Sequence, residues 1–392
     1  MKRAVIVDAV RTPTGKRNGK LGGYHPVDLA AITLRALVER NDMDPGLVDD
    51  VIMGCVMQTG EQSLNVGRNA ALAAGFPEDV VGTTIDRQCG SGQQSSHFAA
   101  QGVMAGAYDV AIAGGVESMT RVPMGITAHQ GPGKPFGPRM VERYAASLVP
   151  QGISAEMIAE KWGLSRASLD RIAYDSHMRA AQATEEGRFD PEIVPVEVAL
   201  NGSREVMVTD EGIRPDTSME VLAGLGPVFK PDGVVTAGNS SQISDGAAAV
   251  LIMSEAKAHE FDLTPKARFV GFALAGVDPV TMLTGPIPAT TRVLGRCGLA
   301  VDDIDLFEVN EAFASVVAIW LAEHGGSDPE ALWQRTNVNG GAIALGHPLG
   351  GTGAKLTATL VHEMERRGAR YGLQTMCEGG GMANAMILER VA

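Results

Sequence analysis

Short apolar runs alternate with amphipathic stretches over the first part of the chain. The apolar runs predict β-strands over residues 4–10, 49–57, 82–86 and 109–117. The stretches between them predict helices over residues 27–38, 68–74 and 95–107. Strands that alternate with helices in this way are typical of a mostly parallel α/β sheet.

The pattern changes between residues 118 and 241. This segment is rich in Gly, Pro, Lys and Arg up to about residue 150, and helical patterns follow over residues 154–161 and 166–186. A strand-like run returns at residues 247–254. We therefore predict a long excursion that is inserted between two elements of the sheet.

The last third of the chain repeats the pattern of the first. Residues 267–274 resemble the opening strand, residues 298–311 resemble 46–54, and residues 372–389 parallel 109–117. A Gly-rich turn also leads into a helical pattern over residues 353–367. This predicts two similar α/β halves: residues 1–117 plus 242–266 and residues 267–392, with residues 118–241 as an inserted loop domain.

Charge and composition limit the kinds of partner. The net charge of −13 repels nucleic acid and anionic membranes, so we expect neither as a partner. No apolar run approaches the ~20 residues of a membrane span. The first apolar run is interrupted by Asp8 and is typical of a strand, not of a signal peptide. We therefore expect a cytoplasmic protein.

The cysteines and the Gly-rich segments exclude several kinds of site. The four cysteines form no CxxC pair, which argues against a zinc or thioredoxin-like site and favours free thiols. Residues 346–355, GHPLGGTGAK, lack the Gly-Lys-Ser/Thr of a P-loop, and Gly90-Ser91-Gly92 lacks the third glycine of a dinucleotide fingerprint. His362-Glu363 has no second histidine at zincin spacing, so we expect no metal.

Cys89 is the first candidate for chemistry. It lies between a predicted strand and a predicted helix, and Gly90 and Gly92 flank it. The positive end of the helix dipole favours a thiolate, and small neighbours let a substrate approach. A lone cysteine is more commonly a buried packing residue, so position alone leaves both readings open.

Three further polar residues follow predicted strands or lie in Gly-rich loops. His347 between Gly346 and Pro348 suits a base that reaches a ligand. Cys377 before three glycines suits proton transfer beside an oxyanion, although strand-end packing explains it equally well. Asn310 can position a water, whereas Glu311 can simply cap the next helix. We interpret the two remaining cysteines, at 55 and 297, as packing residues.

Five segments, taken together and in this order, resemble the thiolase family. They are QCGSG around Cys89, GNSSQISDGAAA (238–249), NEAF (310–313), NVNGGAIALGHPLGGTG (337–353) and CEGGG (377–381). The resemblance covers nearly the whole chain. It implies two βαβαβαββ-type halves in a five-layered α/β/α/β/α arrangement, with a loop domain that covers the site.

The resemblance also implies catalytic roles. Cys89 resembles the nucleophile that carries the acyl group, and His347 the residue that activates it. Asn310 resembles the residue that holds a water in the oxyanion hole shared with His347. Cys377 resembles the acid/base at the α-carbon, and the N–H groups of Cys89 and Gly379 resemble a second oxyanion hole. Two cysteines and a histidine split a difficult carbon–carbon step into two easier ones, without a cofactor.

Substrate contacts and assembly follow from the same resemblance. Ala237 and Ser241 match positions that line the pantetheine of coenzyme A, and Arg214 matches one near its nucleotide. Phe313 and Met282 match acyl-pocket positions. The implied partners are acyl-CoA and coenzyme A, which is a substrate, and the implied assembly is a homodimer or homotetramer.

Some residues depart from the family pattern. Asp86, three residues before Cys89, would disfavour a thiolate if it were near, and we expect it to point away. Pro150-Gln151-Gly152 stands where short-chain biosynthetic members often have His-Met-Gly. The resemblance is closer to degradative thiolases of fatty-acid and sterol catabolism. The alternatives are a biosynthetic acetoacetyl-CoA thiolase, a decarboxylating condensing enzyme, against which Cys377 argues, and a non-catalytic acyl-CoA or lipid-binding protein.

Overall fold

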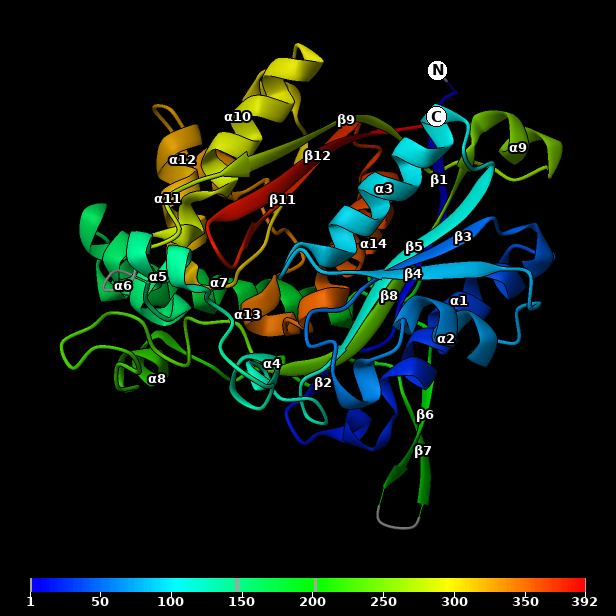
Figure 1. Ribbon diagram of the computed structural model, residues 1–392. Coiled ribbons are helices and arrows are strands. Elements are labelled where there is room, and N and C mark those ends of the chain that lie inside the picture. Colours follow the sequence, from blue (N-terminus) through cyan, green and yellow to red (C-terminus); the bar gives the residue numbers. More distant parts are fainter. Residues whose placement is uncertain (1, 145–147, 201–202, 392) are drawn as a thin grey trace.

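The predicted alternation of strands and helices is present in a computed structural model of the protein, which describes residues 2–144, 148–200 and 203–391 (Figure 1). The first half holds the strands β1 (Ala4–Arg11), β2 (Gly15–Lys16), β3 (Asp50–Gly54), β4 (Val81–Ile85), β5 (Val110–Ser118) and β8 (Ser244–Ser254). Its helices are α1 (Pro26–Arg40), α2 (Val66–Ala73), α3 (Ser91–Ala105) and α9 (Glu255–Glu260).

The second half follows the same order of elements, except that residues 325–348 contain no strand corresponding to β4. Its strands are β9 (Ala267–Gly276), β10 (Leu306–Val309), β11 (Tyr371–Glu378) and β12 (Met382–Arg390). Its helices are α10 (Pro286–Cys297), α11 (Ala314–His324), α12 (Pro329–Trp333), α13 (Ala342–Leu345) and α14 (Leu349–Arg367). In each half, a long helix (α3 or α14) leads into the strand that ends near the site.

The chain between β5 and β8 forms an excursion from the sheet. It contains α4 (Ile126–His129), α5 (Pro138–Tyr144), α6 (Gln151–Lys161), α7 (Arg166–Glu185), α8 (Met219–Ala223) and the hairpin of β6 (Val196–Leu200) and β7 (Ser203–Met207). Short 3-10 turns lie elsewhere, at Lys20–Gly23, Pro45–Leu47, Gly60–Gln62, Met282–Thr284 and Val301–Asp303. Figure 1 shows the β6–β7 hairpin projecting from the body of the molecule.

The strands form a mixed sheet, which corrects the prediction of a mostly parallel one. Its order is β10-β11-β12-β9-β1-β8-β5-β3-β4, with β2 beside β8. Only β3–β4, β3–β5 and β10–β11 are parallel pairs among the described strands. The others are antiparallel because β8 returns from the long excursion and β12 follows a tight turn, and neither needs a crossover helix. A short β1–β9 pairing, Val5 with Arg268 and Ile6 with Ala267, joins the two halves.

The helices form three layers around the two half-sheets, as the resemblance predicted. α1 packs on the outer face of β1, β5 and β8, and α10 on the outer face of β9, β11 and β12. α3 and α14 lie side by side between the halves (Figure 1). Their backbones approach so closely that a methyl group on Gly92 would lie 2.7 Å from Gly350 O, and one on Gly353 would lie 2.0 Å from Gln93 N. The Gly residues therefore permit the packing of the central layer.

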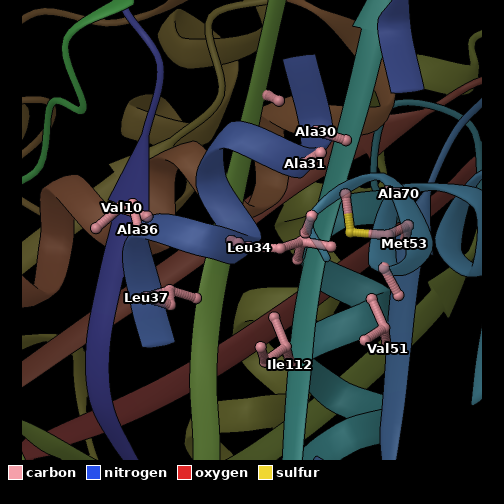
Figure 2. Close-up of a cluster of buried hydrophobic side chains, with 14 of the residues drawn as sticks. Val10, Ala30, Ala31, Leu34, Ala36, Leu37, Val51, Met53, Ala70 and Ile112 are labelled. Carbon is pink, nitrogen blue, oxygen red and sulfur yellow. The ribbon is translucent and has the colours of Figure 1, made fainter. Parts of the chain in front are cut away.

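An apolar stripe on α1 anchors it to the first half-sheet. Ala30, Leu34 and Leu37 recur at helical spacing and are buried against strand residues such as Val51 and Ile112 (Figure 2). Burial of apolar area stabilises the folded state by about 25 cal/mol per Å². The strands are therefore held in fixed positions, and the loops at their ends can hold reactive groups in place.

Candidate active site

Cys89 lies in the tight turn between β4 and α3. Gln88 has a positive φ of 50°, and Ser91 N donates to Gln88 O over 3.0 Å, so the turn reverses the chain just before the helix begins. Cys89 is only 5% exposed. We had predicted that the glycines around it let a substrate approach, and this is wrong because both face other parts of the protein. Gly92 faces α14, and a methyl group on Gly90 would lie 2.0 Å from Glu378 Oε1.

Burial raises the pKa of the Cys89 thiol to about 12, and the neighbouring Glu378 adds to the rise. Hydrogen bonding from the N–H groups of Cys89 and Gly379 and from the Gln151 side chain opposes it. We predicted from the helix dipole a pKa below that of a free thiol, and this is wrong because desolvation outweighs the dipole. A base must therefore take the proton when Cys89 reacts.

His347 has the tautomer that such a base requires. Its Nδ1 lies 2.7 Å from Thr352 Oγ1, and that hydroxyl donates its only proton to Pro348 O over 2.9 Å. Nδ1 must therefore carry a proton and donate it to Thr352, which leaves a lone pair on Nε2. Burial, together with the charge of Lys355, lowers the pKa of His347 to about 3. The imidazole is thus neutral at neutral pH.

The loop that carries His347 is held by the buried Lys355. Its Nζ donates to Leu345 O (2.6 Å), Gly346 O (3.1 Å) and Thr14 Oγ1 (3.1 Å). The backbone N–H of His347 donates to Ser244 Oγ over 3.1 Å. These bonds fix the two residues before His347 and His347 itself.

Asn310 lies beside His347, and Cys377 lies near Cys89. Asn310 Nδ2 is 3.5 Å from His347 Nε2, and its buried Oδ1 has no hydrogen-bond partner among the described residues. Asn310 N donates to Thr375 O over 3.1 Å, which ties the end of β10 to β11 just before Cys377. Cys377 is 1% exposed; burial raises the pKa of its thiol well above the usual range, and the nearby Cys89 and Glu378 raise it further.

Glu311 does not cap α11, the helix that follows it, which we had left open. It is fully buried and accepts hydrogen bonds from Ser176 Oγ (2.7 Å), Asn337 Nδ2 (3.0 Å) and Ile343 N (3.1 Å). It therefore links the end of β10 to the Gly-rich loop that leads to His347, and its role is structural.

A cavity opens beside His347, and a second cavity adjoins it. One, of about 260 Å³, is lined by His347, Phe313, Ala237 and Ser241 together with apolar side chains of the excursion. The other, of about 220 Å³, is lined by Arg214, His177 and Ala237. The cavities share Ala237 and Gln242, so they adjoin. A long ligand can thus extend from Arg214 to His347.

Other singled-out residues lie outside these cavities. Met282 is buried in the cluster that holds Phe313 and Cys377, behind the cavity wall. Asp86 is exposed and accepts a hydrogen bond from Gln88 N over 2.7 Å, while Cys89 is buried. Cys55 is buried just after β3, and Cys297 ends α10, half-buried.

Sequence reasoning missed Thr352 and Lys355, and treated Gln151 only as a departure from the family pattern. Thr352 and Lys355 follow His347 by five and eight residues, and a helix that begins at Leu349 brings them back toward it. Gln151 begins α6 and lines the larger cavity. The signal that could have found Thr352 and Lys355 is the start of α14, which the glycines at 350, 351 and 353 concealed.

The described residues contain neither a membrane-spanning helix nor a metal-binding group. Among residues 2–144, 148–200 and 203–391, no helix has the length and apolar character needed to span a membrane. The same residues contain no group of three or more His, Cys, Asp or Glu side chains arranged to bind a metal ion.

Comparison with known proteins gives consistent matches along the chain. The family model "Thiolase, N-terminal domain" matches residues 4–256, and "Thiolase, C-terminal domain" matches residues 263–390. A steroid 3-ketoacyl-CoA thiolase of Mycobacterium tuberculosis is 50% identical, over 100% of this chain and 95% of its own length. A 3-ketoacyl-CoA thiolase of Bacillus subtilis is 47% identical, over 99% of this chain and 100% of its own.

A solved structure shares the fold. The crystal structure of the Bacillus anthracis acetyl-CoA acetyltransferase superimposes with a TM-score of 0.90 at 40% identity, over 100% of this chain and 99% of that one.

Proposed function

Because the chain belongs to the thiolase family and is an acyltransferase, we propose that it cleaves a 3-oxoacyl-CoA with coenzyme A to give acetyl-CoA and a shortened acyl-CoA. The observation that carries the proposal is the grouping of two buried thiols, a neutral imidazole and a buried amide with a free oxygen, with the imidazole on the wall of a cavity that adjoins a second one. Acyl transfer and carbon–carbon cleavage need these groups together.

In the first proposed step, Cys89 attacks the 3-oxo carbon of the substrate. His347 Nε2 takes the thiol proton, since it carries the ring's lone pair and Nδ1 is committed to Thr352. The N–H groups of Cys89 and Gly379 both face the sulfur, so they stabilise the oxyanion that forms on the attacked carbonyl. The C2–C3 bond then breaks and leaves the acyl group on sulfur.

The enolate of acetyl-CoA is released from the same intermediate. Asn310 and His347 lie within 3.5 Å of each other and form a second site for an oxyanion, with the free Asn310 Oδ1 available to hold a water. Cys377 gives its proton to the α-carbon. The thiol of coenzyme A then gives its proton to the Cys377 thiolate and attacks the acyl-enzyme, and the departing Cys89 sulfur regains its proton from His347. One thioester thereby replaces another in a nearly thermoneutral exchange.

The cavity next to His347 favours an apolar acyl group. Its walls include Met119, Met124, Val228, Phe229 and Phe313. Together with the two 3-ketoacyl-CoA thiolase relatives, this supports a degradative reaction on a fatty or sterol-derived acyl chain. The acetyltransferase likeness keeps acetoacetyl-CoA synthesis as the second candidate. Every proposed step is an acyl or proton transfer that these side chains and coenzyme A can perform without a resident cofactor.

We further propose that the protein is cytoplasmic and forms a homodimer or a homotetramer. Sedimentation of the purified protein tests the oligomeric state.

Two incubations, one with acetyl-CoA and one with acetoacetyl-CoA plus coenzyme A, test the proposal. Enzyme mass and thioester absorbance are followed in both. We expect an acetyl group on the Cys89 peptide and cleavage of a 3-oxoacyl-CoA. An adduct without acetoacetyl-CoA turnover would indicate a bulkier substrate, to be found in a scan of acyl chains. The absence of an adduct from any acyl-CoA would favour the non-catalytic binding protein.

A further inference from the structure

A carboxyl group that the proposed reaction does not use lies behind Cys89. Glu378 is the last residue of β11, between Cys377 and Gly379, and it is fully buried. Neither Oε1 nor Oε2 has a hydrogen-bond partner within the described residues. Leaving a buried carboxylate unpaired costs several kcal/mol, so the group is held there either in its neutral form or for a function.

The surroundings of Glu378 place it against the turn that carries the nucleophile. Its Oε1 fills the space where Gly90 would have a side chain. Asn384 Nδ2 donates to Gly90 O over 3.0 Å, and the buried Asn384 Oδ1 has no partner. Arg87 Nε is also buried and has no hydrogen-bond partner among the described residues. The charge of Arg87 acts on Glu378, but the two side chains form no described ion pair.

The charges around Glu378 are few. Burial raises its pKa to about 8, Arg87 opposes the rise and Asp86 adds to it. The remaining titratable groups that it influences are the two thiols, because a charge on Glu378 raises the pKa of both Cys89 and Cys377. At neutral pH the carboxyl is therefore mostly protonated and adds no charge next to the reacting sulfur.

We propose that Glu378 is a positioning residue that acts through Cys89: as a neutral acid it permits the thiolate to form, and as a carboxylate, in alkaline solution, it opposes the thiolate. The role rests on the proposed function of Cys89 as the nucleophile. A residue with a purely structural role would form hydrogen bonds, whereas Glu378 forms none among the described residues and is packed instead against Gly90, beside the nucleophile. A buried acid that ionises only at alkaline pH therefore lowers thiol reactivity at that pH.

The test is alkylation of Cys89 by iodoacetamide in wild type and Glu378→Gln, followed by peptide mass between about pH 6 and about pH 10. The readout does not depend on turnover, so it separates this proposal from the proposed function. We expect equal rates near pH 6, where both side chains are neutral. Above about pH 8 we expect the variant to react about tenfold faster, as a fall of about one unit in the pKa of the thiol requires. Equal rates at every pH would overturn the proposal.

A control and a second measurement guard against misfolding. Glu308→Gln changes another fully buried glutamate, on β10, and should leave the alkaline part of the alkylation profile as in wild type. The infrared carboxyl band of the wild-type protein should contain a component that is present near pH 6, titrates near pH 8 and is missing from Glu378→Gln. A wild-type spectrum without this component would also overturn the proposal, even if the variant did not fold.

Discussion

The two sides of the site are built differently. On the core side, Cys89, Asn310, His347 and Cys377 are at most 5% exposed, and they lie at the ends of strands or in turns of the two sheet halves. On the side of the excursion, Met124, Val228 and Phe229 line the cavity next to His347 but are 55%, 56% and 37% exposed.

The difference in burial indicates that the two sides of the site have different functions. Buried groups with fixed hydrogen bonds keep one geometry, which proton and acyl transfer require. Exposed apolar side chains on a loop can be exchanged without disturbing that geometry, and we expect them to select the acyl group. Changes on the core side should therefore affect the rate of chemistry, and changes on the excursion side should affect which substrate is bound.

The largest effect is expected for Cys89→Ala. Removing the nucleophile should lower thiolysis by a factor of about 10⁴ or more and abolish the acyl-enzyme, because no other group replaces the sulfur. Intact-protein mass after incubation with an acyl-CoA checks this. An acyl adduct that persists on the variant would show that Cys89 is not the nucleophile.

Cys377→Ala should separate the two half-reactions. We expect the variant to accept an acyl group on Cys89 normally but to lose about 10²- to 10⁴-fold in carbon–carbon bond cleavage, since the α-carbon lacks its acid/base. Exchange of the α-protons of acetyl-CoA with deuterated water measures this step alone. Rapid exchange by the variant would contradict the role of Cys377.

Lys355→Met tests whether the core side depends on its fixed geometry. The variant removes three hydrogen bonds, two of them to the carbonyls before His347, and should lower kcat by about 10²-fold through misplacement of the imidazole. Because the Lys355 charge lowers the pKa of His347, its loss should raise that pKa and move the acid limb of kcat/KM to higher pH.

Lys257→Met, on the surface helix α9, is the matched control for Lys355→Met. It should leave both kcat and the acid limb unchanged. If Lys355→Met lowered kcat without moving the acid limb, the ammonium would position His347 but not tune it.

The pattern of apolar positions predicted most of the order of elements, and the resemblance to the thiolase family predicted the residues of the core side, since position alone left Cys89 and Cys377 open. It placed the starts of α3 and α14 too late, at residues 95 and 353 in place of Ser91 and Leu349. Glycines and buried polar residues look like loop in a local reading, yet here they are helical because two helices approach each other closely. Propensity yields to tertiary packing at such positions.

The contacts that tune the site could not be predicted in this way. The hydrogen bond from His347 to Thr352 and the packing of Glu378 against Gly90 depend on where α14 and α3 come to lie. The pKa of Cys89 depends on burial, which no motif records, and for that reason the dipole argument gave the wrong direction. Gln151 was conspicuous in the sequence as a departure, but its contact with Cys89 required the fold.

Gln151→Met should show how far the excursion reaches into the chemistry. The amide opposes the raised pKa of Cys89, so its loss should raise that pKa further and slow alkylation near pH 8 by about fivefold, the effect of one hydrogen bond. Gln151→Glu, which adds a negative charge, should slow it more. An unchanged alkylation profile in both variants would confine the chemistry to the core side.

Phe229→Ala should have the smallest effect and the one that most sharply separates the two sides. The Phe229 ring contacts Phe313 edge-on, with centroids 6.1 Å apart, and it covers Gly152, where a methyl group would lie 2.2 Å from it. Truncation enlarges the cavity without touching a reacting group, so kcat for acetoacetyl-CoA should stay within about twofold. KM should rise by about two- to fivefold for acyl chains that pack against the ring, as the loss of about 0.5–1 kcal/mol of apolar contact implies. Bulkier acyl groups should be less affected or gain, because the space that the ring leaves becomes available to them. Steady-state kinetics over a series of acyl chains measures this, and a uniform fall in kcat for all chains would mean that the excursion supports the catalytic geometry itself and does not only select the substrate.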